Sequence, residues 1–279
     1  MSRFQSPYQI EDLRRLMENL RDPQYGCNWD KKQSLKSLIA YTLEEAYEVV
    51  DAIESGDFDE IQDELGDLLF QIVFYAQIAQ EQGQFDFNGV VSAIVQKLLR
   101  RHPHVYPDGS FESFGRAPNG GLTPEEVEQR WEQIKNAERA GKKQAAKSLL
   151  DDVPVSLPAM DRAKKLQKRA SSAGFDWETT APVLAKLKEE VAELEAEIAG
   201  GDKALMSAEL GDVLFSCVNL ARHLGVEPEA ALRQTNAKFE RRFRTIEQLA
   251  EGHKRNISDL SLEEMDRFWD EAKQREQLD

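Results

Sequence analysis

The sequence predicts an all-α protein made of two similar helical domains in tandem. Acidic residues recur in two copies of one motif at a fixed interval, and apolar residues recur at helical spacing through most of the chain. No stretch of any length shows the alternation that is typical of a β-strand. The length of 279 residues agrees with a division into two domains.

The repeated motif consists of five acidic residues in two groups. The first copy contains Glu44, Glu45, Glu48, Glu64 and Asp67, and the second copy, 145 residues later, contains Glu189, Glu190, Glu193, Glu209 and Asp212. At about 100° per residue, the first three acids of each copy share one helix face, and the last two are neighbours on another helix. Two antiparallel helices would direct four or five carboxylates into one space. Oxygen ligands of this kind suit Mg²⁺, or Mn²⁺ in its place.

A solvated acidic surface is the alternative interpretation of this motif, because acid-rich helices usually face water. The residues that follow each copy weaken that alternative. Residues 68–75 and 213–218 are apolar nearly all round their helices, which is typical of core helices. Acids embedded in such helices are costly unless a cation compensates them.

The first domain is predicted to span residues 1–141. We expect helices over about 8–21, 34–54, 59–82 and 87–101, with proline or glycine in the breaks between them. Residues 107–123 contain several prolines and glycines and few apolar residues, so a flexible polar loop is expected there. Thr123 and Pro124 then predict the N-cap and first turn of a helix that runs to about residue 140.

A basic linker over residues 142–150 is predicted to lead to the second domain, residues 151–279, which begins with a helix at about 158–172. This domain repeats other positions of the first at slightly drifting intervals. The matched pairs are Gly26 and Gly174, Trp29 and Trp177, Lys97 and Lys238, Arg101 and Arg242, Trp131 and Trp269, and Lys135 and Lys273. The drift in the interval places small length changes in the connections.

Charge and composition limit the classes of partner. A net charge of −15 argues against binding a nucleic-acid polymer through its phosphates, but not against a nucleotide whose phosphates are bridged to acids by a metal. Cys27 and Cys217 stand in dissimilar contexts, which predicts free thiols in a reducing cytoplasm. No signal peptide is visible, and polar residues interrupt the longest apolar run, so we expect a cytoplasmic protein without a membrane span.

Several side chains outside the acidic motif are candidates for binding phosphates or a base. Lys238 and Arg242 share a helix face, which suits a triphosphate beside a metal, although a solvated basic face is the alternative. Trp269 and Trp131 suit stacking on a base or ribose, although such tryptophans more often belong to the core. The sequence contains no Glu-x-x-His pattern of di-iron bundles and no P-loop motif.

The two copies of the motif differ around their acids. On the same helix face, the second copy continues with Ser216 and Asn219, and the first continues with Gln71 and Phe74. One turn before the motif, the second copy has Lys186 where the first has Tyr41. We therefore predict that the second domain binds substrate, with Asn219 and Lys186 among the contacts. The alternative is that Lys186 only pairs with Glu190 and that Asn219 is a hydrogen-bonded core residue.

The core helices are predicted to carry more apolar surface than a domain of four or five helices can cover. We place this surplus around Phe70, Phe74 and Tyr75, and we expect a homodimer formed through helix faces.

The chain resembles the MazG family. The resemblance rests on the duplicated Glu-Glu-x-x-Glu and Glu-x-x-Asp motifs, with the segments Arg101–Val105 and Lys238–Phe243, and covers about residues 8–275. It implies a homodimer of tandem all-α MazG domains that hydrolyses nucleoside triphosphates to monophosphates and diphosphate with Mg²⁺, in nucleotide-pool housecleaning. One departure is Asn28, where the family commonly has proline, and it concerns the loop before the first acidic helix.

The resemblance also implies roles for individual residues of the second domain. The implied metal ligands are Glu190, Glu193, Glu209 and Asp212, with Glu45, Glu48, Glu64 and Asp67 as their N-terminal equivalents. The implied substrate contacts are Lys186, Glu190, Lys238, Arg242 and Trp269, with Lys135 reaching in from the preceding segment. We add Glu189 as the candidate that orients or deprotonates the attacking water. A non-catalytic helical module that binds a nucleotide or a partner is the alternative function.

Overall fold

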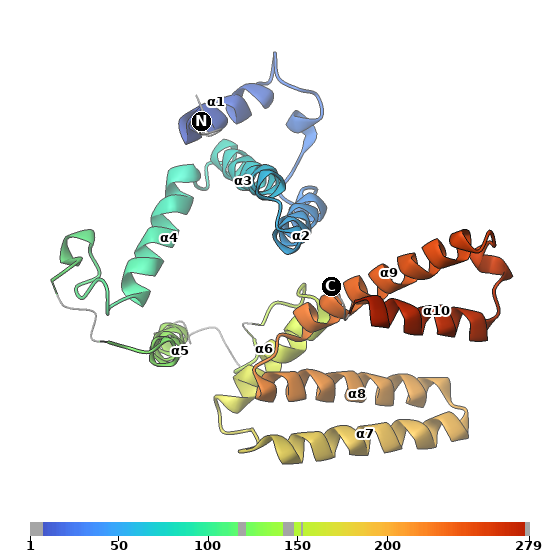
Figure 1. Cartoon of the computed structure of the whole chain (residues 1–279). Coiled ribbons are helices and arrows are strands. Elements are labelled where there is room, and N and C mark those ends of the chain that lie inside the picture. Colours follow the sequence, from blue (N-terminus) through green and yellow to red (C-terminus); the bar gives the residue numbers. More distant parts are fainter. Residues whose placement is uncertain (1–7, 117–120, 142–147, 152, 277–279) are drawn as a thin grey trace. The chain divides into compact units, whose positions relative to one another are not determined.

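The computed structural model describes residues 8–116, 121–141, 148–151 and 153–276. Every regular element in these ranges is a helix, and they contain no strand (Figure 1). The chain divides into two compact units, Met1–Arg139 (unit 1) and Ala140–Asp279 (unit 2). The prediction of an all-α fold with two helical domains is confirmed. Residues 142–147 of the predicted linker lie outside the described residues.

Unit 1 is built around an antiparallel hairpin of α2 and α3, with α1 and α4 packed on α3 (Figure 1). Its helices are α1 (Ile10–Leu20), α2 (Ile39–Ser55), α3 (Phe58–Glu81), α4 (Phe87–Arg101) and α5 (Pro124–Gly141), with short 3₁₀ turns η1 (Asp30–Lys32) and η2 (Phe111–Ser113). The start of α5 is fixed as predicted, because Thr123 Oγ1 accepts the Glu126 N–H at 3.2 Å and the Thr123 N–H donates to the Glu126 carboxylate at 2.8 Å.

Two local predictions in unit 1 differ from the structure. Helix α2 begins at Ile39 instead of residue 34, because Ser34 and Ser37 hydrogen-bond to each other's backbone N–H groups at 2.9 and 3.2 Å. Such bonds offer the backbone an alternative to the helix. The expected loop over 107–123 contains η2, and Asp108 binds the Ser110 N–H at 2.9 Å and Arg116 at 3.0 Å. Residues 117–120 of that loop lie outside the described residues.

The core of unit 1 lies between α1 and α3. Its fully buried members are Met17, Leu38, Val73, Phe74 and Ile78. Phe74 is 0% exposed, and Phe70 and Tyr75 pack against this core, so the prediction of surplus apolar surface around these three residues is wrong. The error has a physical cause, since α3 is apolar nearly all round and only its packing on α1 decides which face is covered. The exposed large apolar side chains of α3 are Phe58, Leu65, Leu69 and Ile72.

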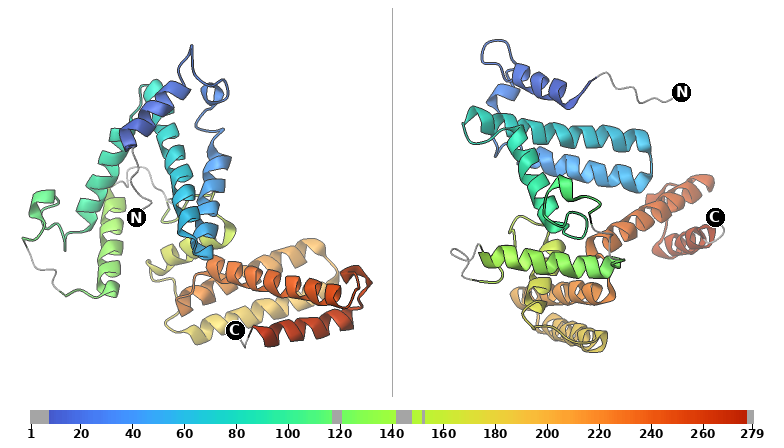
Figure 2. Two further views of the ribbon diagram at one scale, coloured as in Figure 1. Left: turned by 45° about the horizontal axis from the view of Figure 1, so that its top comes forward. Right: turned by 90° about the vertical axis from the view of Figure 1, so that its left-hand side faces the viewer.

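Unit 2 repeats the central hairpin with α7 and α8, and α6 packs on α8 (Figure 2). Its helices are α6 (Ala159–Ser171), α7 (Thr180–Gly200), α8 (Lys203–Leu224), α9 (Pro228–Gly252) and α10 (Leu262–Arg275), with the 3₁₀ turn η3 (Ile257–Asp259). Helices α9 and α10 form a second hairpin. The turns of the two central hairpins are alike: Gly56 and Gly201 both have positive φ, of 78° and 79°, and are followed by Asp57 and Asp202, which cap the next helix.

Helix α8 is long and apolar enough to cross a membrane by length and composition alone, and no other helix in the described ranges is. Several of its apolar side chains, including Leu205, Leu210 and Leu214, are exposed in unit 2. The absence of a membrane span therefore stays a prediction.

Candidate active site

Three carboxylates of unit 2 converge between α7 and α8. Glu190 and Glu193 come from α7 and Glu209 from α8, and one oxygen of each lies within 4.8 Å of the others. Glu190 is only 7% exposed, whereas Glu193 is exposed and Glu209 is half-buried. Mg²⁺ takes oxygen ligands at about 2.0–2.1 Å, so its ligand oxygens lie up to about 4 Å apart. The donor set fits this ion after a small contraction.

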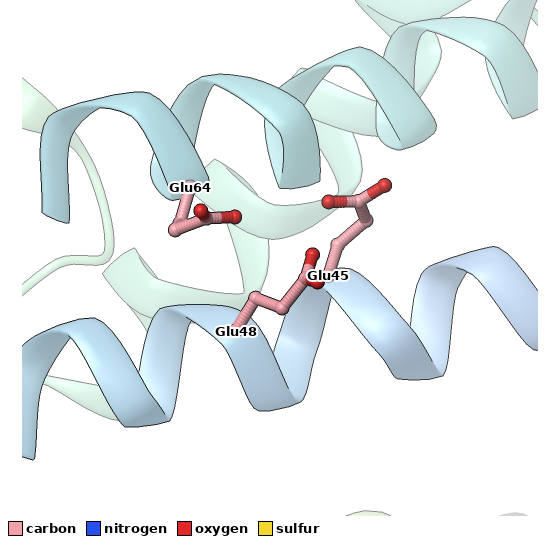
Figure 3. A group of neighbouring side chains, drawn as sticks. All are labelled: Glu45, Glu48 and Glu64. Carbon is pink, nitrogen blue, oxygen red and sulfur yellow. The ribbon is translucent and has the colours of Figure 1, made fainter. Parts of the chain in front are cut away.

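Unit 1 contains the equivalent cluster. Figure 3 shows Glu45 and Glu48 from α2 and Glu64 from α3 directed into the space between the two helices. One oxygen of each again lies within 4.8 Å of the others. The repeat of the sequence is therefore a repeat of geometry.

The pKa values of these acids show that the clusters are electrostatically strained. A hydrogen bond shared with Glu190 raises the pKa of Glu193, and desolvation and the charges of Glu190 and Glu209 act in the same direction. In unit 1, desolvation raises the pKa of Glu45, followed by the charges of Asp67 and Glu48. Desolvation also raises the pKa of Glu64. A bound cation would remove this cost in either unit.

The fourth acid of each copy lies beside its cluster. Asp212 follows Glu209 by one turn of α8 and lines the cavity described below. Asp67 lies near enough to Glu45 to raise the pKa of that carboxyl. Neither aspartate belongs to the group of oxygens within 4.8 Å, so the structure places both beside the predicted metal ligands without showing contact.

Lys186 is bound to the acids of its own helix. Its ammonium lies 2.9 Å from a carboxylate oxygen of Glu189 and 2.9 Å from one of Glu190. The ion pair between Lys186 and Glu190, which we named as the alternative to a substrate role for Lys186, is therefore present. It is not a surface pair, because Glu190 is buried. The side chain of Glu189, the predicted base, is more than half exposed.

A cavity of about 370 Å³ opens beside Glu190, between α6, α7, α8 and the loop before α7. Its polar lining includes four residues that the sequence predicted and Ser216 of the predicted polar face; these are Lys186, Glu190, Asp212, Ser216 and Asn219. Gln167, Asp176 and Arg222 also line the cavity and were not predicted from the sequence, and Trp177 was predicted only as a repeated position. The intervals of 145 and 148 residues seen in the sequence pair Met17 with Arg162 and Lys165, so the match of Gln167 with Met17 needs the helix ends that the structure shows.

A chain of hydrogen bonds fixes Asn219, which is 9% exposed. Its oxygen accepts from Arg222 Nε at 3.1 Å and from Nη2 at 2.8 Å. Arg222 in turn binds both oxygens of Asp176, at 2.6 and 2.8 Å, and His223 lies 2.9 Å from the same carboxylate. These hydrogen bonds, Arg222 first, lower the pKa of Asp176 to about 2. Asn219 is thus a bonded residue, as the alternative held, and it still borders the cavity.

The cations predicted to bind phosphates are arranged differently. Arg242 on α9 lies 2.8 Å from Glu276, with its guanidinium 5.4 Å from the ring centre of Trp269 on α10, and Lys238 is exposed on α9. None of these three lines the cavity. Lys135 belongs to unit 1, where it pairs with Glu132 at 2.9 Å and lies 5.2 Å from the ring of Trp131. Their contacts with substrate stay predictions.

The repeat, its paired carboxylate clusters and the adjoining cavity can be compared with known proteins. The MazG nucleotide pyrophosphohydrolase domain matches the chain twice, at residues 33–106 and 178–246. The chain belongs to the MazG family. The nucleoside triphosphate pyrophosphohydrolase of Escherichia coli (strain K12) is 51% identical over 270 residues, which cover 96% of this chain and 98% of that protein. The nucleoside triphosphate pyrophosphohydrolase/pyrophosphatase MazG of Thermotoga maritima is 40% identical over 264 residues, 95% of each chain. The matched regions of this MazG chain contain both acidic clusters.

Proposed function

We propose that this chain is a Mg²⁺-dependent nucleoside triphosphate pyrophosphohydrolase, an acid-anhydride hydrolase that converts a nucleoside triphosphate and water to the monophosphate and diphosphate. The observation that carries the proposal is the cluster of Glu190, Glu193 and Glu209 at the edge of a cavity of nucleoside size. Relatives that match nearly the whole chain carry the name of this activity. Mn²⁺ has the same preference for oxygen ligands and is proposed as a substitute.

Unit 2 is the proposed working site because its cluster and its cavity are continuous. Glu190 belongs to both, and Asp212 lines the cavity one turn from Glu209. In unit 1 the matching region is filled with aromatic side chains. Trp29 packs edge-on against Tyr41, with ring centres 5.7 Å apart, and against Phe74 at 6.5 Å.

The chemistry follows from the donor set. Glu190, Glu193, Glu209 and Asp212 would hold the cation, which when bound neutralises phosphoryl oxygens and the leaving diphosphate. Water would add to the α-phosphorus while the bond from that phosphorus to the α–β bridging oxygen breaks. Glu189 is the proposed acceptor of the water's proton. Lys186 lies beside both glutamates and is placed to contact a phosphate oxygen.

We also propose a cytoplasmic homodimer that acts in nucleotide-pool housecleaning. Support for the dimer comes from Leu184, Val191 and Ile198, which are exposed on α7 at intervals of seven residues, a spacing typical of helix–helix seams. Leu210 and Leu214 are exposed apolar side chains of α8, the helix that pairs with α7. A partner chain that covers this surface accounts for the apolar character of α8 without a membrane. The net charge of −15 supports a free nucleotide and not a nucleic-acid polymer as the ligand.

Product analysis tests the proposed reaction. The protein is incubated with one nucleoside triphosphate and Mg²⁺, and the products are resolved by ion-exchange chromatography over time. We expect the monophosphate and diphosphate to appear in equal amounts, with no reaction in EDTA. A nucleoside diphosphate as the first product would contradict the proposal, because it would mean that water attacks the γ-phosphorus and releases phosphate. No turnover with any common nucleotide would favour the non-catalytic binding module.

A further inference from the structure

We propose that Gln167 is a specificity-determining residue whose buried side-chain oxygen accepts an N–H group of the nucleobase. The inference deepens the proposed function, on which it rests, and it starts from a difference between the two units. The cavity of unit 2 occupies a place where unit 1 has a packed apolar core.

The register between α1 and α6 follows from matching backbone hydrogen bonds at the ends of these helices. The Cys27 N–H donates to the Leu20 carbonyl at 2.8 Å, and the Phe175 N–H donates to the Ala170 carbonyl at 3.1 Å. Aligning Leu20 with Ala170 pairs Met17 with Gln167. On the central hairpins, the 145-residue interval pairs Leu38 with Val183 and Phe74 with Asn219.

In these three pairs, the residues of unit 1 belong to its apolar core, and the matching residues of unit 2 line its cavity. Met17, Leu38 and Phe74 are each 0% exposed and belong to one apolar cluster in unit 1. Gln167, Val183 and Asn219 are also nearly buried, at 7%, 1% and 9% exposed, and all three line the cavity of unit 2. Two large apolar side chains are thus replaced by two amides. Buried amide atoms cost stability unless they are hydrogen-bonded, so an atom of these two amides that the protein leaves unpaired is a candidate for binding a ligand.

The protein fixes the orientation of both amides. Gln167 Nε2 donates to the Phe215 carbonyl at 2.8 Å, and the reversed amide would set two oxygens against each other. This leaves Gln167 Oε1 buried without a hydrogen-bond partner in the described structure. Asn219 must turn its oxygen to Arg222, which only donates, so the group that it can offer a ligand is its NH₂.

The cavity therefore presents one acceptor, Gln167 Oε1, and one donor, the Asn219 NH₂. A nucleobase edge carries the complementary pair, an N–H beside a carbonyl or ring nitrogen. Phe215 and Trp177 line the same space and suit the faces of a planar ring. Glu190 belongs both to the lining of this cavity and to the acidic cluster, so a base in the cavity would place its phosphates near the cluster. A buried acceptor discriminates against an analogue that lacks the N–H, because Gln167 Oε1 would then stay buried without a hydrogen-bond partner.

Methylated uracil nucleotides test this acceptor directly. We would titrate the full-length protein with UMP, 3-methyl-UMP and 5-methyl-UMP by calorimetry, and compare KM for the matching triphosphates. Both analogues carry one added methyl group, but only the 3-methyl compound has lost the N–H. We expect 3-methyl-UMP to bind about tenfold or more weakly than UMP, and 5-methyl-UMP to bind within about threefold.

The variant Gln167→Met tests whether Gln167 itself causes this discrimination, because methionine is the residue that unit 1 has at the matching position. The variant should bind UMP more weakly and bring the ratio of the dissociation constants of UMP and 3-methyl-UMP close to one. Gln234→Met, on an exposed position of α9, should keep the parent ratio.

Equal binding of UMP and 3-methyl-UMP by the parent protein would overturn the inference, as would no binding of UMP, or an unchanged ratio in Gln167→Met. The parent comparison needs no variant to fold. Failure of the proposed function is separately visible: diphosphate release without discrimination between the analogues rejects only this inference, and discrimination without diphosphate release rejects only the hydrolase.

Discussion

Lys186 Nζ lies 2.9 Å from Glu190 Oε1, one turn away on α7. This contact compensates the most buried acid of the unit 2 cluster, whereas Glu193 gains most of its electrostatic environment from other carboxylates. The two glutamates of one metal cluster therefore differ in what they cost the folded protein. Glu190 has Lys186 in direct contact, whereas for Glu193 the charge of Lys186 is outweighed by Glu190, desolvation and Glu209, so its pKa is raised.

The first prediction concerns Glu193→Gln. The change removes one proposed ligand, so turnover with Mg²⁺ should fall at least about 100-fold, which corresponds to roughly 3 kcal/mol in the activation barrier. Without metal, stability should hold or rise. The raised pKa of Glu193 means that its carboxylate is disfavoured in the folded state, so this penalty is absent at low pH and grows as the pH rises through the folded pKa.

Thermal melting in EDTA at pH 8 and pH 4 measures this penalty. We expect Glu193→Gln to melt at or above the parent temperature at pH 8, and the difference to shrink at pH 4, where the raised pKa favours the neutral carboxyl of Glu193. Added Mg²⁺ should raise the melting temperature of the parent more than that of the variant. A large loss of stability in EDTA would assign Glu193 a structural role.

The second prediction uses Asp176, whose pKa of about 2 lies below its ordinary value of 3.8. A lowered pKa stabilises the fold above the unfolded pKa, and this contribution is lost as the pH falls from about 4 to 2. Asp176→Asn should therefore cost stability at pH 7 and about one third as much at pH 2.5, just above the folded pKa. The full shift corresponds to roughly 2 kcal/mol, and partial exposure reduces our expectation to about 1 kcal/mol.

Denaturant unfolding of the parent and Asp176→Asn at several pH values measures this difference. Asp161→Asn, on α6 of the same unit, is the control for removal of one negative charge outside the Asp176–Arg222 pair. A cost that stays constant from pH 7 to pH 2.5 would mean that the Asp176–Arg222 pair acts through shape and not through charge.

The sequence predicted the positions of the acids well because helix geometry alone determines them. Residues three and four apart share a face in any α-helix, so Glu190, Glu193 and Glu209 needed only the knowledge that two helices pair. The cavity depended on more than this. The alignment of Gln167 with Met17 follows from the backbone hydrogen bonds at the ends of α1 and α6, at an interval of 150 residues that differs from the 145 of the central helices.

The surroundings of the predicted phosphate-binding cations depend on packing in the same way. Substrate contacts of Arg242 and Trp269 stay predictions, and the pairing of α9 with α10 places the guanidinium over the ring and beside Glu276. Unit 1 repeats the ion pair, with Arg101 2.6 Å from Glu138. Periodicity cannot distinguish a cation that clamps two helices from one that binds phosphate. Likewise, it could not show that Phe74 is core and Leu69 is exposed.

The third prediction concerns the homodimer. The exposed seam on α7 and α8 should pack against a second copy, so light scattering at micromolar concentration should give twice the mass of 31.8 kDa. Val191→Glu places a charge in the middle of this seam and should shift the protein toward the monomer with its helix content kept. Leu262→Glu changes an exposed apolar residue at the start of α10 and should leave the dimer intact. A monomeric parent, or a Val191→Glu variant that stays dimeric, would contradict the proposed seam.

The last prediction separates the two acidic clusters. Glu209 and Glu64 occupy matching places on α8 and α3, and each belongs to a group of three carboxylates within 4.8 Å. Only the Glu209 cluster adjoins the cavity lined by Gln167 and Asn219, whereas Phe74 fills the matching place beside the Glu64 cluster. Glu209→Gln should therefore remove most turnover, and Glu64→Gln should retain most of it.

The two variants form a matched pair, because each removes one charge from the same position of a repeated motif. Turnover of one nucleoside triphosphate is measured for both at saturating Mg²⁺, together with melting in EDTA. Both changes relieve repulsion among carboxylates, so neither should lower the melting temperature by more than a few degrees. Equal losses of turnover would mean that both clusters work or that they are strongly coupled. That result would end the assignment of unit 1 to a mainly structural role, since its packed core around Met17 and Phe74 would then not prevent catalysis.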